Sequence, residues 1–134
     1  MSEITLLGIL QVSVVVFFGY ITYLFCRLYK TGKRLRRTIP PLVAEHKKLS
    51  KHTLRVLIVA IVVTEIMVRV KGGSQYDAAF FQHIIADGCF LILFLVTIYW
   101  VNGLKNPLYH RALAYATIFL YAAVLWTGLP LLFR

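Results

Sequence analysis

Three ionisable side chains interrupt stretches that are otherwise apolar enough to cross a bilayer. His83 and Asp87 are four residues apart, so on a helix they lie on one face, one turn apart. Glu65 lies in the preceding apolar stretch, at about the depth of Asp87 when both are counted from the outer boundary at about 1.5 Å per residue. Ionisable groups are costly inside a bilayer and mark candidate functional sites there. These three residues are therefore the first candidates for chemistry.

Imidazole and carboxylate groups together are ligands for several transition metals, among them copper, iron and zinc. We therefore predict a metal site formed by Glu65, His83 and Asp87 in the core of a helical bundle, near the outer face of the membrane. Three alternatives remain open. The groups can form a hydrogen-bonded cluster that shares a proton, they can contact a partner subunit, or the outer end of these helices can be hydrated. The same outer layer contains further polar residues: Gln11, Ser13, Thr64 and Thr127.

A second group of histidines lies toward the cytoplasmic side. His46 and His52 belong to the start of the second expected helix, and His110 begins the fourth. Paired histidines on facing spans hold haem b in membrane cytochromes. His52 and His110 therefore define a candidate haem site. The alternative is that they are interfacial histidines that meet headgroups or water.

The composition explains why these residues must lie on membrane helices. The chain has 134 residues, of which 60% are hydrophobic and 15% charged, with a mean hydropathy of +0.76. A soluble domain has about 25% charged residues. We expect a single all-α integral membrane domain over residues 1–134, a four-helix bundle with up-down topology. The expected spans are residues 4–26, 53–70, 80–104 and 112–133, and the second helix can begin as early as Pro41. Glycines at 8, 19, 88 and 128 are expected to allow close approach of helices.

The charge distribution sets the expected orientation. Ten of the fifteen basic residues lie between Arg27 and Arg55, mostly in a segment, 27–52, expected as a basic cytoplasmic loop. The positive-inside rule then places both termini on the outer side of the cell membrane, that is, the plasma or inner membrane. The basic segment is expected to meet anionic headgroups. The net charge of +10 therefore reflects membrane topology, and we expect no nucleic-acid partner.

The sequence contains no signature of a hydrolytic or phosphoryl-transfer enzyme. It has no Gly-rich phosphate loop, no nucleophile elbow and no serine-histidine-acid order. The two cysteines, Cys26 and Cys89, are not spaced as a metal or redox pair. Proton or ion movement along Glu65 and Asp87 would need polar residues toward the inner side, where these spans offer few. A non-catalytic role is therefore expected.

Four short motifs resemble a known family. They are Glu45-His46-Lys47-Lys48-Leu49 before the second span, His83 at the start of the third, His110-Arg111-Ala112-Leu113-Ala114 at the start of the fourth, and Thr127-Gly128 near its end. From about Val43 onward the chain resembles the small four-span membrane family that includes the CtaM-like proteins linked to haem-copper oxidase maturation. Two features depart from the family pattern. Glu65 stands where the family has a tyrosine or histidine, and the loop 71–79 is short.

The resemblance implies a role in the assembly or composition of a respiratory complex. We therefore expect a non-catalytic accessory subunit or maturation factor of a larger membrane metal-dependent oxidase or oxygenase. The partners would be the large oxidoreductase subunits and the lipid bilayer. The alternative function is a small redox protein that binds haem b.

Overall fold

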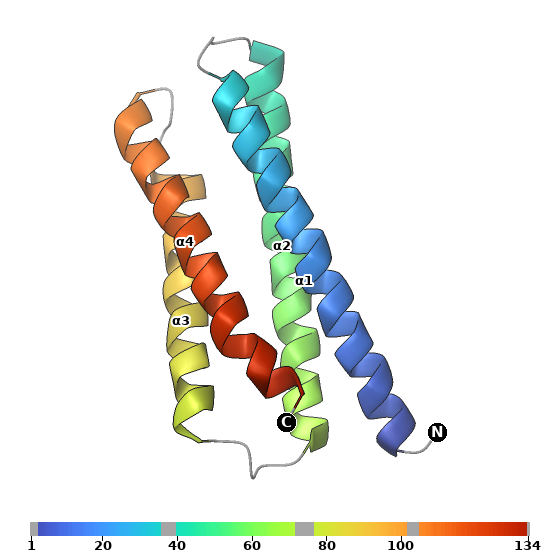
Figure 1. Cartoon of the computed structure of the whole chain (residues 1–134). Coiled ribbons are helices and arrows are strands. Elements are labelled where there is room, and N and C mark those ends of the chain that lie inside the picture. Colours follow the sequence, from blue (N-terminus) through green and yellow to red (C-terminus); the bar gives the residue numbers. More distant parts are fainter. Residues whose placement is uncertain (1–2, 36–39, 72–76, 102–104, 134) are drawn as a thin grey trace. The chain divides into compact units, whose positions relative to one another are not determined.

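The computed structural model describes residues 3–35, 40–71, 77–101 and 105–133, and these ranges are almost entirely helical (Figure 1). In chain order the helices are α1 (Glu3–Arg34), α2 (Pro40–Lys71), α3 (Ala78–Leu95), the π-helical turn η2 (Val96–Trp100) and α4 (Pro107–Leu132). Because η2 continues α3 directly, the described residues form four rods and no strand. The expected all-α class is confirmed.

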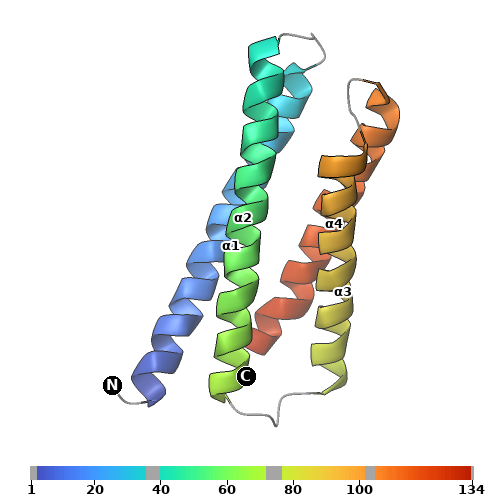
Figure 2. The same ribbon diagram turned by 180° about the vertical axis from the view of Figure 1, so that it is seen from behind.

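The chain divides into two compact units, residues 1–73 and 74–134. In the first unit, α1 and α2 lie side by side and run antiparallel. In the second unit, α3 and its extension η2 lie along α4, again antiparallel (Figure 2). Each unit is thus a helical hairpin, in keeping with up-down order. The single packed domain over residues 1–134 stays a prediction.

Three helical stretches are long and apolar enough to cross a bilayer: Ile4–Arg34, Ala78–Trp100 and Pro107–Leu132. The chain is therefore a membrane protein. The expected span 53–70 lies within α2 and contains Arg55, Glu65 and Arg69. Those charges lower the mean hydropathy of α2, and its membrane crossing stays a prediction.

The helix bounds differ from the expected spans at several ends. The segment expected as a basic loop, 27–52, is helical up to Arg34 and again from Pro40, so most of its charges lie on helical faces. The early start of α2 was anticipated, because proline suits the first turn of a helix. α4 also begins early, at Pro107, and η2 ends at Trp100. The residues expected to end the third span, 102–104, and most of the loop 71–79 lie outside the described residues.

The start of α3 is fixed by a cap. The Asp77 side chain accepts a hydrogen bond from the backbone N–H of Phe80 at 3.0 Å. An aspartate in this position satisfies a helix-end donor that has no partner inside the helix. The cap fixes the register of α3, and therefore places His83 in the second turn of the helix and Asp87 in the third.

Both hairpins have apolar cores along the contact between their helices. In the first, Ile21 and Leu24 of α1 and Leu57 of α2 are almost fully buried. In the second, Phe90 is fully buried and packs against Tyr121 with ring centroids 5.6 Å apart. This distance is in the range of favourable aromatic pairs. These contacts hold each pair of helices in one register, which decides which polar side chains meet.

Nine serine and threonine side chains on these helices share one hydrogen-bond pattern. Each donates to the backbone carbonyl four residues earlier: Ser13, Thr22, Thr31, Ser50, Thr53, Thr64, Thr97, Thr117 and Thr127. Apolar surroundings favour this arrangement, because the hydroxyl hydrogen needs an acceptor and the helix supplies one. While a hydroxyl donates in this way, it can only accept a bond from the neighbouring helix. Where two such hydroxyls meet, as Thr97 and Thr117 do at 3.4 Å, one of them must donate to the other.

Close approach at glycine is confirmed at one of the four expected positions. A Cβ added at Gly8, Gly19 or Gly88 would meet no atom within 4 Å. A Cβ added at Gly128 would lie 2.7 Å from Cε1 of His83. Within each hairpin, therefore, no neighbour covers the first three glycines, and close approach there stays a prediction.

Candidate functional site

His83 of α3 meets α4 at a Thr-Gly dipeptide. Its Nδ1 lies 3.1 Å from Oγ1 of Thr127, and its ring lies against Gly128. We call these three residues the His83 cluster. Two members of the expected polar layer, His83 and Thr127, are therefore in contact.

The hydrogen-bond pattern favours one tautomer of His83. Oγ1 of Thr127 lies 2.9 Å from the carbonyl of Ala123 and 3.3 Å from that of Val124, so it can donate its hydrogen to either. While the hydroxyl donates there, it accepts the bond from His83, because it has one hydrogen. In this arrangement Nδ1 of His83 carries the proton, and in the neutral ring Nε2 carries the lone pair.

Gly128 fixes the position of the ring. A Cβ at this residue would lie 2.7 Å from Cε1 of His83, 3.2 Å from Nδ1 and 3.3 Å from Nε2. Contacts shorter than about 3 Å are repulsive, so any larger residue would displace the ring. The absence of a side chain at Gly128 thus provides the space that His83 occupies.

Asp87 adds a carboxylate to this end of the second hairpin. It lies one turn beyond His83 on the same face of α3, and the two side chains interact electrostatically. Both are partly buried. A lone-pair nitrogen and a carboxylate oxygen on successive turns form a pair of ligand groups that a transition metal can use.

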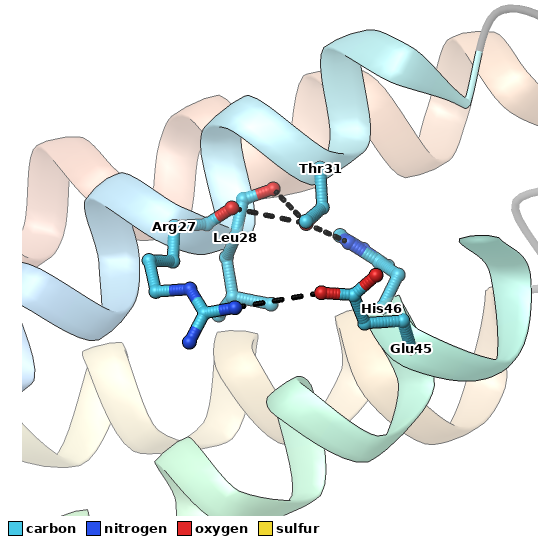
Figure 3. Close-up of polar contacts among 5 residues, drawn as sticks. All are labelled: Arg27, Leu28, Thr31, Glu45 and His46. Carbon is cyan, nitrogen blue, oxygen red and sulfur yellow. Dashed lines mark hydrogen bonds and ion pairs between the residues drawn. The ribbon is translucent and has the colours of Figure 1, made fainter.

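The first hairpin contains a related arrangement near the end where α1 and α2 are connected. Oγ1 of Thr31 lies 2.9 Å from Nδ1 of His46, and Gly32 is the next residue of α1 (Figure 3). We call Thr31, Gly32 and His46 the His46 cluster. Thr31 donates to the carbonyls of Arg27 and Leu28, both at 3.0 Å. The same argument favours the proton on Nδ1 of His46.

The His46 cluster differs from the His83 cluster in two respects. A Cβ at Gly32 would lie 3.6 Å from Cε1 of His46, an ordinary van der Waals distance. An ion pair also flanks the cluster, since Arg27 Nη2 lies 3.4 Å from Oε1 of Glu45 (Figure 3). Both charged side chains are about half exposed (46% and 55%), so the pair is solvated and weak.

The residues of the expected haem site lie in different units. Nε2 of His52 is 3.0 Å from the hydroxyl of Tyr20, so α1 already occupies this nitrogen. His110 lies in the first turn of α4, where its backbone N–H donates to the backbone carbonyl of Asn106 at 3.0 Å. A haem on His52 through Nε2 would have to displace Tyr20. The haem site of His52 and His110 stays a prediction.

The expected metal site also draws on both units. Glu65 belongs to α2, where its Oε1 bonds Nε of Arg69 at 3.0 Å, whereas His83 and Asp87 belong to α3. Over the ranges that the structure describes, no group of three or more His, Cys, Asp or Glu residues is arranged to hold a metal ion. The structure thus brings together His83 and Asp87, and the site of three residues stays a prediction.

Comparisons with known proteins found no match. No protein-family model, curated protein or solved structure matches the chain. The likeness to the CtaM-like family therefore stays an expectation drawn from short motifs.

Sequence reasoning missed the partner of each histidine. Thr127 was assigned to a polar layer and Thr31 to no site. One signal could have identified both. The sequence contains two Thr-Gly dipeptides, 31–32 and 127–128, and each receives a histidine of the antiparallel helix.

Proposed function

We propose that this protein is a non-catalytic membrane component of a larger metal-dependent oxidase or oxygenase, acting as accessory subunit or maturation factor. His83 and Asp87 hold a transition metal (copper, iron or zinc) for that complex. Glu65 or a group of the partner supplies a further ligand. The protein acts in the plasma or inner membrane.

The observation that carries this proposal is the contact of 3.1 Å between Nδ1 of His83 and Oγ1 of Thr127, in which the threonine can serve as the acceptor. Histidines that bind metals usually donate their other ring N–H to a fixed acceptor, which sets the tautomer and the ring orientation. His83 has this arrangement, and Asp87 follows one turn away. Two ligands from one helix leave coordination positions for a partner, as expected of a protein that holds a metal within a complex or passes it on.

Native mass spectrometry of the protein extracted in mild detergent from its own membrane tests the proposal. We expect the chain to appear with large oxidoreductase subunits. We also expect His83→Ala and Asp87→Ala to lower the metal content of those subunits. Thr117→Val, in the same hairpin but away from His83, is the matched control. Normal metal content in both site variants would refute the metal-holding role, and a chain carrying only an added haem mass would support the haem b alternative.

We further propose that the basic end of the first hairpin contacts anionic headgroups. Eight basic residues lie on two helical faces there: Arg27, Lys30, Lys33 and Arg34 of α1, and Lys47, Lys48, Lys51 and Arg55 of α2. The one acidic residue among the described residues from 27 to 55 is Glu45. Each basic residue near an anionic surface contributes about 1 kcal/mol. The triple variant Lys47→Gln, Lys48→Gln, Lys51→Gln should therefore retain fewer anionic lipids in the same spectra, and unchanged retention would contradict the proposal.

A further inference from the structure

Two residues of the His83 cluster, Thr127 and Gly128, constrain the ring of His83. Thr127 accepts the Nδ1 proton, because its own hydrogen is committed to the carbonyl of Ala123. Gly128 lies under the edge of the ring that carries both nitrogens. One residue therefore sets the tautomer and the other sets the ring position.

The geometry points to Thr127 and Gly128 as positioning residues that present Nε2 of His83 as the nitrogen ligand of a divalent transition metal. This inference rests on the proposed function and makes it more specific. It states which nitrogen binds, which side chain holds the proton on the other nitrogen, and why a glycine must follow the threonine. Asp87 is the companion ligand on the next turn.

The alternative tautomer would give this cluster one hydrogen bond fewer. If Nε2 carried the proton, Thr127 would have to turn its hydrogen from the carbonyl of Ala123 to Nδ1, 3.1 Å away. The carbonyl of Ala123 would keep its helical N–H partner. The two bonds through Thr127, one accepted and one donated, would then become a single bond. The hydrogen bonds of α4 therefore favour the tautomer that leaves Nε2 able to bind a metal.

The test is nitrogen NMR of the full chain in lipid nanodiscs, with the histidine rings labelled with ¹⁵N. His83→Gln identifies the signals of His83 among those of the four histidines. Without metal, we expect a protonated Nδ1 and an unprotonated Nε2. Zn²⁺, used as the probe, should shift Nε2 of His83 while Nδ1 stays protonated.

Two variants test whether Thr127 positions the His83 ring or only stabilises the fold. Thr127→Val removes the acceptor while conserving shape, and should mix the two tautomers and weaken Zn²⁺ binding by about 10–100-fold, the usual effect of losing such a partner. Thr127→Ser restores the acceptor and should restore both the tautomer and most of the affinity. Thr117→Val, the control on α4, should change neither.

The outcomes distinguish this inference from the proposed function. A protonated Nε2 in the wild type, or Zn²⁺ affinity unchanged in Thr127→Val, would overturn the inference while leaving a metal-holding role intact. A wild-type His83 that shows no response to Zn²⁺ would overturn both. The expected tautomer together with a Zn²⁺ shift at Nε2 and rescue by serine would support both.

Discussion

The two hairpins bring the same three residue types, Thr, Gly and His, into contact. They differ in how closely the glycine approaches the histidine ring. In each, a Thr-Gly dipeptide near the C-terminal end of one helix meets a histidine near the N-terminal end of its antiparallel neighbour. The hydrogen bonds are similar, at 2.9 Å for Thr31 and 3.1 Å for Thr127. The glycines differ, because an added Cβ would lie 3.6 Å from His46 but 2.7 Å from His83.

This difference shows that one dipeptide can serve two purposes. At His46 the threonine supplies a polar contact between helices, and the glycine could be replaced without a clash. At His83 the glycine is a steric requirement as well. A close surface restricts a ring in addition to a hydrogen bond, and Gly128 gives His83 such a surface. The second hairpin therefore places a steric constraint on its histidine, next to a carboxylate.

The largest expected effect comes from adding one methyl group to each glycine in turn. Gly128→Ala should displace the His83 ring, break its bond to Thr127 and lower the free energy of unfolding of the protein by about 1–3 kcal/mol. Gly32→Ala should be neutral or stabilising by up to about 1 kcal/mol, since alanine favours a helix and meets no clash. Thermal unfolding in detergent measures both. Equal effects of the two changes would remove the contrast between the clusters.

The two threonines allow a comparison of the hydrogen bonds alone. Thr31→Val and Thr127→Val should each destabilise the protein by about 0.6 kcal/mol, the average for polar contacts between membrane helices, and by no more than about 1.7 kcal/mol. Double-mutant cycles with His46→Ala and His83→Ala isolate the pairwise energies. If either cycle gave no coupling, the corresponding threonine would not be the partner of its histidine.

A smaller effect is expected for the third histidine contact. Tyr20→Phe removes the hydroxyl that bonds His52 and should cost about 0.5–1.5 kcal/mol. It should also free Nε2 of His52, so the variant is the most favourable form of the protein for haem binding. Absorption spectra after addition of haem compare it with the wild type. If a haem complex needed His52 in the wild type but not in Tyr20→Phe, the hydroxyl of Tyr20 would not be what keeps haem from Nε2 of His52.

The smallest effects belong to the ion pairs. Glu45→Gln removes the exposed pair with Arg27, and Glu65→Gln removes the pair with Arg69 within α2. Each change should alter the free energy of unfolding by less than about 1 kcal/mol, and the effect of Glu45→Gln should fall as salt is added. Unfolding at low and high ionic strength checks both. A loss for Glu45→Gln larger than that for Thr31→Val would make the ion pair, rather than the histidine, the main polar contact of this hairpin.

Part of this molecule could be predicted from the sequence. Apolar stretches and helix-start prolines predicted the helices, including the early start of α2, because local composition decides whether a segment is helical. The prediction of a loop at residues 27–34 was wrong. The segment is basic, but it contains no proline, and its one glycine, Gly32, lies within α1. The start of α3 follows a known sequence signal, an aspartate just before an apolar helical stretch.

The pairing of side chains was harder to predict. His83 and Asp87 share a face by spacing alone, and the sequence showed this. The contact of His83 with Thr127 and Gly128 depends on the register between α3 and α4, which the packing of Phe90 against Tyr121 helps to set. Four glycines looked equivalent in sequence, and only Gly128 has a side chain over it. Register between helices is a property of packed cores, and no single segment encodes it.

The length of α1 has a consequence for where its polar contacts reside. The helix has 32 residues, about 48 Å, whereas the hydrocarbon layer is about 30 Å thick. Its apolar part ends at Cys26, so Thr31 lies in a basic extension beyond it. Bilayers of different thickness differ in how much of such an extension they cover. We therefore expect a thicker bilayer to cover more of the His46 cluster than a thinner one does.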